Sequence, residues 1–293
     1  MNFGTRQPGD IWTSASQFLP SGRELSEFLA NESSFPYQSP SELSDLAKVA
    51  SYYVEALERT DLRERLRDVF NRDCQPGTIH TYLARTAAIH PLLIVTTNYD
   101  DLTERAFEAA KQPYDLVVHP TDNEDWREFV LWWKHGAAAP EHVLPNMLHI
   151  DLDSTTVIYK MHGTMDRRQM EFDSYVITED DYVEFLTRMV TGTAVPMQFM
   201  RHFRERHFLF LGYGLQDWNW RVVLKHLRTQ STRVHGDATQ SSGASRREEP
   251  GRRSWAIQFR PSDLEKELWD RRDVKIYDVD INSFVDRLLK QAP

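Results

Sequence analysis

The residues best placed for chemistry are the polar ones that end the apolar run at 92–101, which reads LLIVTTNYDD. The apolar part is typical of a strand, and it breaks into two threonines, an asparagine, a tyrosine and two aspartates. In an open α/β sheet, ligands bind outside the carboxyl ends of the strands. We therefore expect Thr97, Asn98 and Asp100 to lie at a site rather than in the core.

Two later segments end in a similar way. Residues 157–163 (VIYKMHG) close an apolar run with His162 and a glycine, and residues 208–217 (FLFLGYGLQD) close one with Gly-x-Gly and a helix start. A glycine turn lets the backbone approach a ligand closely, and a helix N-terminus favours anions. The sequence thus predicts three strand ends around one pocket.

Two other His-Gly pairs compete with His162 for this role. Residues 129–136 (FVLWWKHG) place His135 after an apolar run, and His235 precedes a glycine in a polar stretch. His135 is followed by three alanines and a proline, whereas His162 ends a β-branched strand and begins a polar turn. We therefore favour His162.

The composition excludes several classes of protein. A chain of 293 residues with 40% hydrophobic and 12% aromatic residues can bury a large core. The net charge of -9 argues against a broad nucleic-acid surface, and the arginines at 246–253 are interleaved with acids. No apolar run reaches the roughly 18 residues of a membrane helix, and no secretory signal opens the chain. We expect a cytoplasmic protein with no membrane partner.

The cysteine content bears on metal and redox chemistry. Cys74 is the only cysteine, so the chain can form no intramolecular disulfide. It also cannot build a zinc site from paired Cys-x-x-Cys motifs. We expect no zinc.

The order of elements indicates an α/β fold with a Rossmann-like parallel sheet flanked by helices and a helical N-terminal portion. Residues 21–90 have helical periodicity, and strands are expected at 92–97, 116–118, 155–161 and 208–211 and in the segments SWAIQF and VKIYDVD. Residues 121–153 fit neither pattern, and 229–253 are predicted to be a mobile loop. We interpret residues 1–293 as one domain with an atypical stretch at 1–18.

Four segments carry a family resemblance. TTNYDDLTERAF, KMHGTMD, VITEDDYVEFL and FLFLGYGLQDWNWR, in this order and spacing, resemble the sirtuin-like family of bacterial anti-phage defence. Members of that family are NAD hydrolases on a Rossmann-type fold. The closing segment from SWAIQF to IYDVDINSFVDRLL is similar as well, so the resemblance covers roughly residue 20 to the end.

The resemblance implies roles for individual residues. Asn98 and His162 correspond to the family's catalytic pair, and Asp100 is the nearest carboxylate for supporting positive charge. Cleaving the nicotinamide–ribose bond develops oxocarbenium character on the sugar. Histidine can act as a base toward a ribose hydroxyl, and an amide can orient the ribose or a water. Contacts to NAD are expected from Thr96, Thr97, Tyr99, Gly163, Gly212, Gly214 and Asp217.

Each candidate also has a purely structural explanation. Asn98 and Asp100 could cap the helix that starts at 102, because both residue types are common caps. His162 could be a hydrogen-bonded structural histidine. Gly212 and Gly214 could be plain turn glycines, and Asp217 could be a helix cap.

The N-terminus departs from the family. Members normally begin with an apolar strand and a Gly-Ala-Gly-x-Ser loop that cradles the NAD phosphates. Here that place holds MNFGTRQPGDIWTSASQF, with no apolar strand and no Gly-x-Gly turn. Either the chain begins downstream of the usual start or this member has lost the loop. In both cases we expect weak NAD binding, because the donors aimed at the pyrophosphate are missing.

Three hypotheses from different classes follow. The first is an NAD hydrolase that releases nicotinamide and ADP-ribose and acts in anti-phage defence by depleting NAD. The second is a catalytically impaired sirtuin-like binding or scaffold protein. The third is an NAD-dependent protein deacylase, which a single cysteine disfavours because such enzymes usually carry a four-cysteine zinc module. A homo-oligomer or a separately encoded defence partner is compatible with all three.

Overall fold

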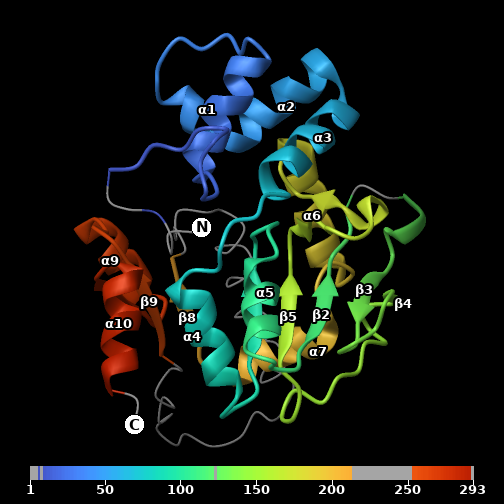
Figure 1. Ribbon diagram of the computed structural model, residues 1–293, viewed down its shortest axis with the longest axis vertical. Helices are drawn as coiled ribbons and strands as arrows, with labels where there is room; N and C mark the ends of the chain where they lie inside the picture. The colour runs from blue at the N-terminus through green and yellow to red at the C-terminus, as the bar shows by residue number, and fades with distance from the viewer. Residues whose placement is uncertain (1–5, 7–8, 122–123, 213–252, 292–293) are drawn as a thin grey trace, which may run out of the picture. The chain divides into compact units, whose positions relative to one another are not determined.

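The structure is a computed structural model that describes residues 6, 9–121, 124–212 and 253–291 (Figure 1). The chain divides into two compact units, Met1–Pro196 and Met197–Pro293. Both units combine strands with helices, so the predicted α/β class is confirmed.

A five-stranded mixed sheet organises the first unit. Its order is β1-β5-β2-β3-β4. The strands are β1 (Leu93–Thr96), β2 (Asp115–Val118), β3 (Val130–Trp133), β4 (Glu141–Val143) and β5 (Val157–Lys160). β5 lies between β1 and β2 and is parallel to both, whereas β3 and β4 are antiparallel additions. These two edge strands fall in the segment that the sequence pattern left unassigned.

Two helices cover one face of this sheet. They are α4 (Thr78–Ala87) and α5 (Leu102–Ala109). Ala84 of α4, Phe107 of α5 and Ile158 of β5 form a common buried cluster. Because side chains alternate along a strand, Ile158 and Lys160 of β5 point to this face.

The helix α6 (Glu179–Thr191) packs beside the carboxyl ends of β2 and β5. Its N-cap is Thr178, whose side chain accepts from the Asp181 backbone N–H while Asp181 bonds back to the cap, which completes a capping box. The segment TEDD supplies both this cap and an acidic first turn. The ring of Phe185 contacts the rings of His119, just after β2, and His162, just after β5, edge to face.

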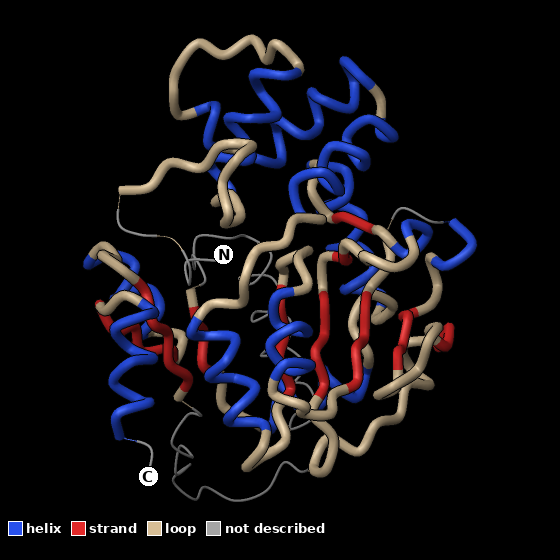
Figure 2. Tube along the Cα trace, in the orientation of Figure 1, coloured by secondary structure: helices blue, strands red, loops and turns tan. Residues whose placement is uncertain are grey.

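The N-terminal helices form a layer beyond the carboxyl ends of β5 and β2 (Figures 1 and 2). They are α1 (Gly22–Glu32), a 3-10 turn (Glu42–Ser44), α2 (Leu46–Leu57) and α3 (Arg59–Phe70), as their helical periodicity predicts. Arg59 pairs with Asp181 at 2.9 Å and Arg67 pairs with Asp173 at 2.6 Å. Half-buried pairs of this kind fix the helices over the sheet edge.

The second unit contains a smaller parallel sheet in the order β10-β9-β8. Its elements are α7 (Met197–Glu205), β8 (Leu209–Leu211), β9 (Ser254–Gln258), α9 (Asp263–Asp270), β10 (Val274–Asp278) and α10 (Ile281–Gln291). The predicted strands at 208–211, in SWAIQF and in VKIYDVD are confirmed. The loop predicted at 229–253 lies outside the described residues except for its last one.

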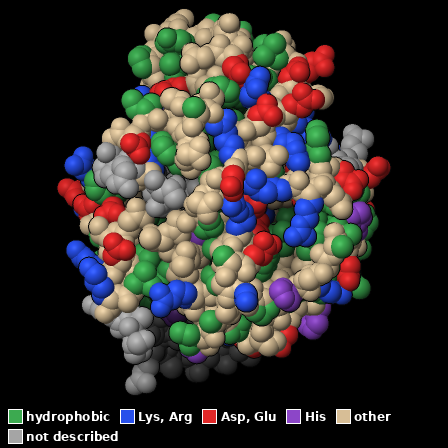
Figure 3. Space-filling model, in the orientation of Figure 1, with side chains coloured by type: hydrophobic (Ala, Val, Ile, Leu, Met, Phe, Trp, Pro, Cys, Tyr) green, Lys and Arg blue, Asp and Glu red, His purple; other side chains and the backbone are tan. Residues whose placement is uncertain are grey.

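No strand precedes β1 within 9–92, the part of the N-terminal region that the structure describes without a gap. Among the described helices, none has the length and apolar character needed to cross a membrane. Acidic and basic side chains are interspersed on the face of the molecule that Figure 3 shows.

A close backbone approach follows β5. β6 (Gly163–Thr164) pairs with β7 (Ser174–Tyr175), and two further 3-10 turns lie at Glu124–Trp126 and Met170–Phe172. Gly163 has a φ of +86°, and a Cβ added there would lie 2.1 Å from the Ser174 carbonyl oxygen. Both the dihedral angle and the space therefore require glycine at this position.

The Gly163→Ala substitution is expected to lower the free energy of unfolding by at least about 2 kcal/mol, because it combines a positive φ with a backbone clash. Chemical denaturation monitored by circular dichroism measures the change. Gly136→Ala is the control: Gly136 has a φ of +79°, but open space surrounds its Cβ position. Equal losses for the two variants would show that the clash contributes nothing.

His119 is a completely buried histidine under α6. It is 0% exposed, and neither ring nitrogen has a hydrogen-bond partner among the residues that the structure describes. Burial, with help from nearby Arg188 and His162, holds the pKa of His119 well below its ordinary value. The folded protein therefore keeps this imidazole neutral.

This burial predicts a loss of stability in mild acid. The unfolded chain binds a proton at His119 below a pH of about 6.5 while the folded chain does not. The free energy of unfolding should therefore fall as the pH drops from 7.5 to 5, by up to about 1.4 kcal/mol per pH unit from this group. His119→Leu should flatten the slope, whereas His90→Leu, at an exposed histidine, should leave it unchanged. Urea denaturation of the parent and both variants at several pH values measures the three slopes.

Candidate active site

The pairing of β1 with β5 brings the two main candidates to one edge. Thr96 is the register partner of Lys160, and the Met161 backbone N–H donates to the Thr96 carbonyl at 2.9 Å. Asn98 lies two residues after Thr96, and His162 lies two residues after Lys160. Because β1 and β5 are neighbouring parallel strands, the segments that carry the two residues both leave the sheet at its carboxyl edge.

The turn after β1 is held by local hydrogen bonds. The Asn98 backbone N–H donates to Thr96 Oγ1 at 3.1 Å, and the Leu102 backbone N–H donates to Asp100 Oδ1 at 3.1 Å. Asp100 therefore supports the first turn of α5, which agrees with its structural explanation. The half-buried Asn98 and Thr97 precede this helix start.

Lys160 reaches the same turn from β5. Its side chain is 0% exposed, and Nζ donates to the carbonyls of Asp100 at 2.6 Å and Tyr99 at 3.2 Å. It also donates to Glu104 Oε1 at 2.8 Å. Burial raises the pKa of Glu104, and the ammonium of Lys160 opposes that rise. The sequence pattern singled out this lysine only as part of the segment VIYKMHG.

His162 lies in an aromatic setting at the end of β5. Its side chain is 2% exposed, and its ring lies edge to face against Tyr182 at 5.6 Å and Phe185 at 5.3 Å. Its carbonyl accepts from the Val176 backbone N–H at 3.0 Å. His135, the competing histidine, is exposed and follows the antiparallel strand β3.

A second histidine accompanies His162. His119 follows β2, the other neighbour of β5, and its backbone N–H donates to the Lys160 carbonyl at 3.0 Å. The rings of both histidines contact Phe185. Sequence reasoning missed His119, although the run LVVH shows the same apolar strand that ends in a histidine.

Tyr99 occupies the core rather than an open surface. Its hydroxyl donates to the Val176 carbonyl at 2.6 Å, and its ring contacts Phe70 and Tyr175 edge to face. The side chain thus links the turn after β1 to α3 and β7. The proposed contact of Tyr99 with NAD stays a prediction.

The remaining candidates belong to the second unit. Gly212 follows β8 with a φ of +63°, and a Cβ there would lie 3.2 Å from Ile281 Cδ1. This left-handed turn is one that glycine favours. Gly214 and Asp217 lie outside the described residues. The roles of all three stay predictions.

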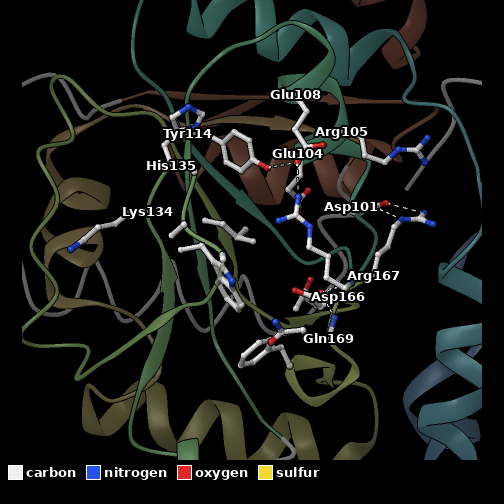
Figure 4. Close-up of a pocket in the computed structure, with 18 of the residues that line it drawn as sticks. Asp101, Glu104, Arg105, Glu108, Tyr114, Lys134, His135, Asp166, Arg167 and Gln169 are labelled. Carbon is white, nitrogen blue, oxygen red and sulfur yellow. Dashed lines mark hydrogen bonds and ion pairs between the residues drawn. The ribbon is translucent and has the colours of Figure 1, made fainter.

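A cavity of about 630 Å³ lies beside the turn on the α5 face of the sheet (Figure 4). Asp101, Glu104 and Thr164 contribute to its wall, and Arg167 pairs with Asp101 at its edge. Its volume is within the usual range for small-molecule sites. Neither Asn98 nor His162 lines it, so this cavity and the predicted pair occupy different positions on the first unit.

Among the residues that the structure describes, no group of three or more His, Cys, Asp or Glu side chains is arranged to hold an ion. Cys74 is buried and unbonded to another cysteine.

Comparison with known proteins agrees with the strand-end pattern. The chain is 30% identical over 201 residues to an NAD(+) hydrolase, ThsA, of Acinetobacter baumannii (strain 532279). That match covers 66% of this chain and 34% of the relative, so the chain spans about a third of the relative's length. The sequence profile of the SIR2-like domain matches residues 92–277, which contain β1, β5 and the turns that follow them. The parallel core and its profile match together show that the chain belongs to the SIR2-like domain family.

Proposed function

We propose that this protein is an NAD hydrolase that cleaves the nicotinamide–ribose bond and releases nicotinamide and ADP-ribose. The observation that carries the proposal is the register of β1 and β5, because the segments with Asn98 and His162 follow neighbouring strands of a SIR2-like domain at the same edge. Similarity to an NAD(+) hydrolase supports the choice of substrate.

The residues at this edge fit the chemistry of an N-glycosidic bond. An imidazole such as that of His162 can accept a proton from a ribose hydroxyl. The Asn98 carboxamide can both donate and accept hydrogen bonds, so it can orient the ribose or the attacking water. Asp100 is the carboxylate nearest to this pair in the chain, and its negative charge favours the positive charge that develops on the sugar.

The groups proposed to hold the rest of the substrate come from several strand ends. Thr96 ends β1 and Thr97 follows it, whereas Gly163 begins β6 directly after His162. Gly212, Gly214 and Asp217 are proposed to approach the pyrophosphate, because a glycine turn before a helix presents backbone N–H donors. We further propose a cytoplasmic protein that depletes NAD in anti-phage defence, as a homo-oligomer or with a separately encoded partner.

A second candidate is a binding protein that keeps the fold without the chemistry. The near-complete burial of His162 under Tyr182 and Phe185 favours it.

Substitution of the pair tests the hydrolase. Asn98→Ala and His162→Ala should each lower kcat for nicotinamide release at least about 100-fold, since each removes a group that acts on the reacting sugar. Chromatography of NAD, nicotinamide and ADP-ribose measures the rates. His135→Ala is the matched control, because it removes an exposed histidine from another His-Gly pair. An active parent whose two variants keep full activity would contradict the assignment.

Calorimetry separates the hydrolase from the binding protein. Titration of NAD into the His162→Ala variant should show binding with an affinity close to that of the parent, because the imidazole serves chemistry more than ground-state binding. A parent that binds NAD with micromolar affinity would contradict the second candidate, which keeps the fold without the cofactor site. A parent that neither binds nor cleaves NAD would favour that candidate and contradict the hydrolase.

A further inference from the structure

Lys160 joins both halves of the candidate catalytic pair. It is the last residue of β5, two residues before His162, and its ammonium contacts the main chain directly after Asn98. One side chain thus reaches from the strand that precedes the histidine to the turn that carries the asparagine.

The hydrogen bonds of Lys160 are complete. An ammonium has three N–H donors, and Nζ has three acceptors: two main-chain carbonyls and one carboxylate oxygen. The shortest contact, 2.6 Å, is to the Asp100 carbonyl rather than to Glu104. The lysine therefore binds the main chain of the turn at least as closely as it binds the carboxylate of Glu104.

A role in stability alone does not account for this arrangement. Moving an ammonium and a carboxylate out of water is costly, and replacing such a pair by apolar side chains is often neutral or stabilising. Glu104 Oε2 is itself buried, with no hydrogen-bond partner in the described part of the chain. What an apolar pair could not supply is a donor for the carbonyls of Tyr99 and Asp100.

We propose that Lys160 is a positioning residue for the active site. Its ammonium holds the 97–101 turn against β5 so that Asn98 keeps its place beside His162. This inference rests on the proposed hydrolase function for its kinetic consequence. Its structural part, the restraint of the turn, stands on the contacts of Nζ alone.

The test compares four proteins: the parent, Glu104→Gln, the double variant Lys160→Met with Glu104→Gln, and Val157→Ala. The double variant removes the ammonium without leaving a buried carboxylate. Glu104→Gln keeps both the ammonium and an amide oxygen for it. Val157→Ala controls for lost stability, because Val157 is fully buried on β5 and lies outside the site.

Hydrogen–deuterium exchange measures the restraint without any need for activity. In the double variant, amides of 97–104 should exchange at least about tenfold faster, because the local bonds at Asn98 and Leu102 then open more often. Exchange in α2 should stay at the parental rate. In Glu104→Gln and Val157→Ala, the turn should exchange within about threefold of the parent. Parental exchange of the turn in the double variant would overturn the proposal.

Steady-state kinetics on NAD measures the consequence. The double variant should lose about 10- to 100-fold in kcat with KM changed less than about threefold, since a misplaced catalytic group costs chemistry more than binding. Val157→Ala should keep kcat within about threefold. Faster exchange with parental kcat would overturn the positioning role. An inactive parent would contradict the proposed function instead, and the exchange data alone would then decide whether Lys160 restrains the turn.

Discussion

The parallel pairing of β1 with β5 is the interaction on which the rest of the first unit depends. It joins strands that begin at Leu93 and Val157, more than sixty positions apart, and places their polar ends at one edge. Parallel strands require a long crossover connection, and here the chain between them also supplies α5, β2 and the edge strands. The edge position of the candidate pair and the reach of Lys160 follow from this register, whereas the two histidines beside Phe185 depend on the pairing of β2 with β5.

The helical layer over that edge is fixed mainly by arginines. Arg59 bonds to Asp181 and to the Tyr175 carbonyl, while Arg67 bonds to Asp173 and to the Asp166 carbonyl. Each guanidinium thus ties α3 to the chain that follows β5. A planar guanidinium can satisfy a carboxylate and a carbonyl together, which a lysine does less well.

Local patterns predicted the strands of the parallel core but not the contacts between them. β1, β5 and β9 were predictable because β-branched runs end abruptly in polar residues, and α6 was predictable from its capping box. β3 and β4 were not, since the aromatic run VLWW fits a helix as well as an edge strand. Lys160 and His119 acquire their environment only from pairing with distant strands, so no local pattern reveals their burial. The near-complete burial of His162 was also unpredictable, because it too depends on segments distant in the sequence.

Several polar side chains are buried at the carboxyl edge of the sheet, where apolar side chains would stabilise the fold more. Lys160, Glu104, Asp100, His119 and His162 are all nearly inaccessible, and they cluster around the carboxyl ends of β1, β5 and β2. Burying such groups costs free energy, and His119 lacks the hydrogen bonds that would offset it. Natural folds depart from good packing chiefly where function requires it. The buried polar side chains therefore favour this edge of the sheet as the site of the proposed activity. This argument does not depend on any sequence motif.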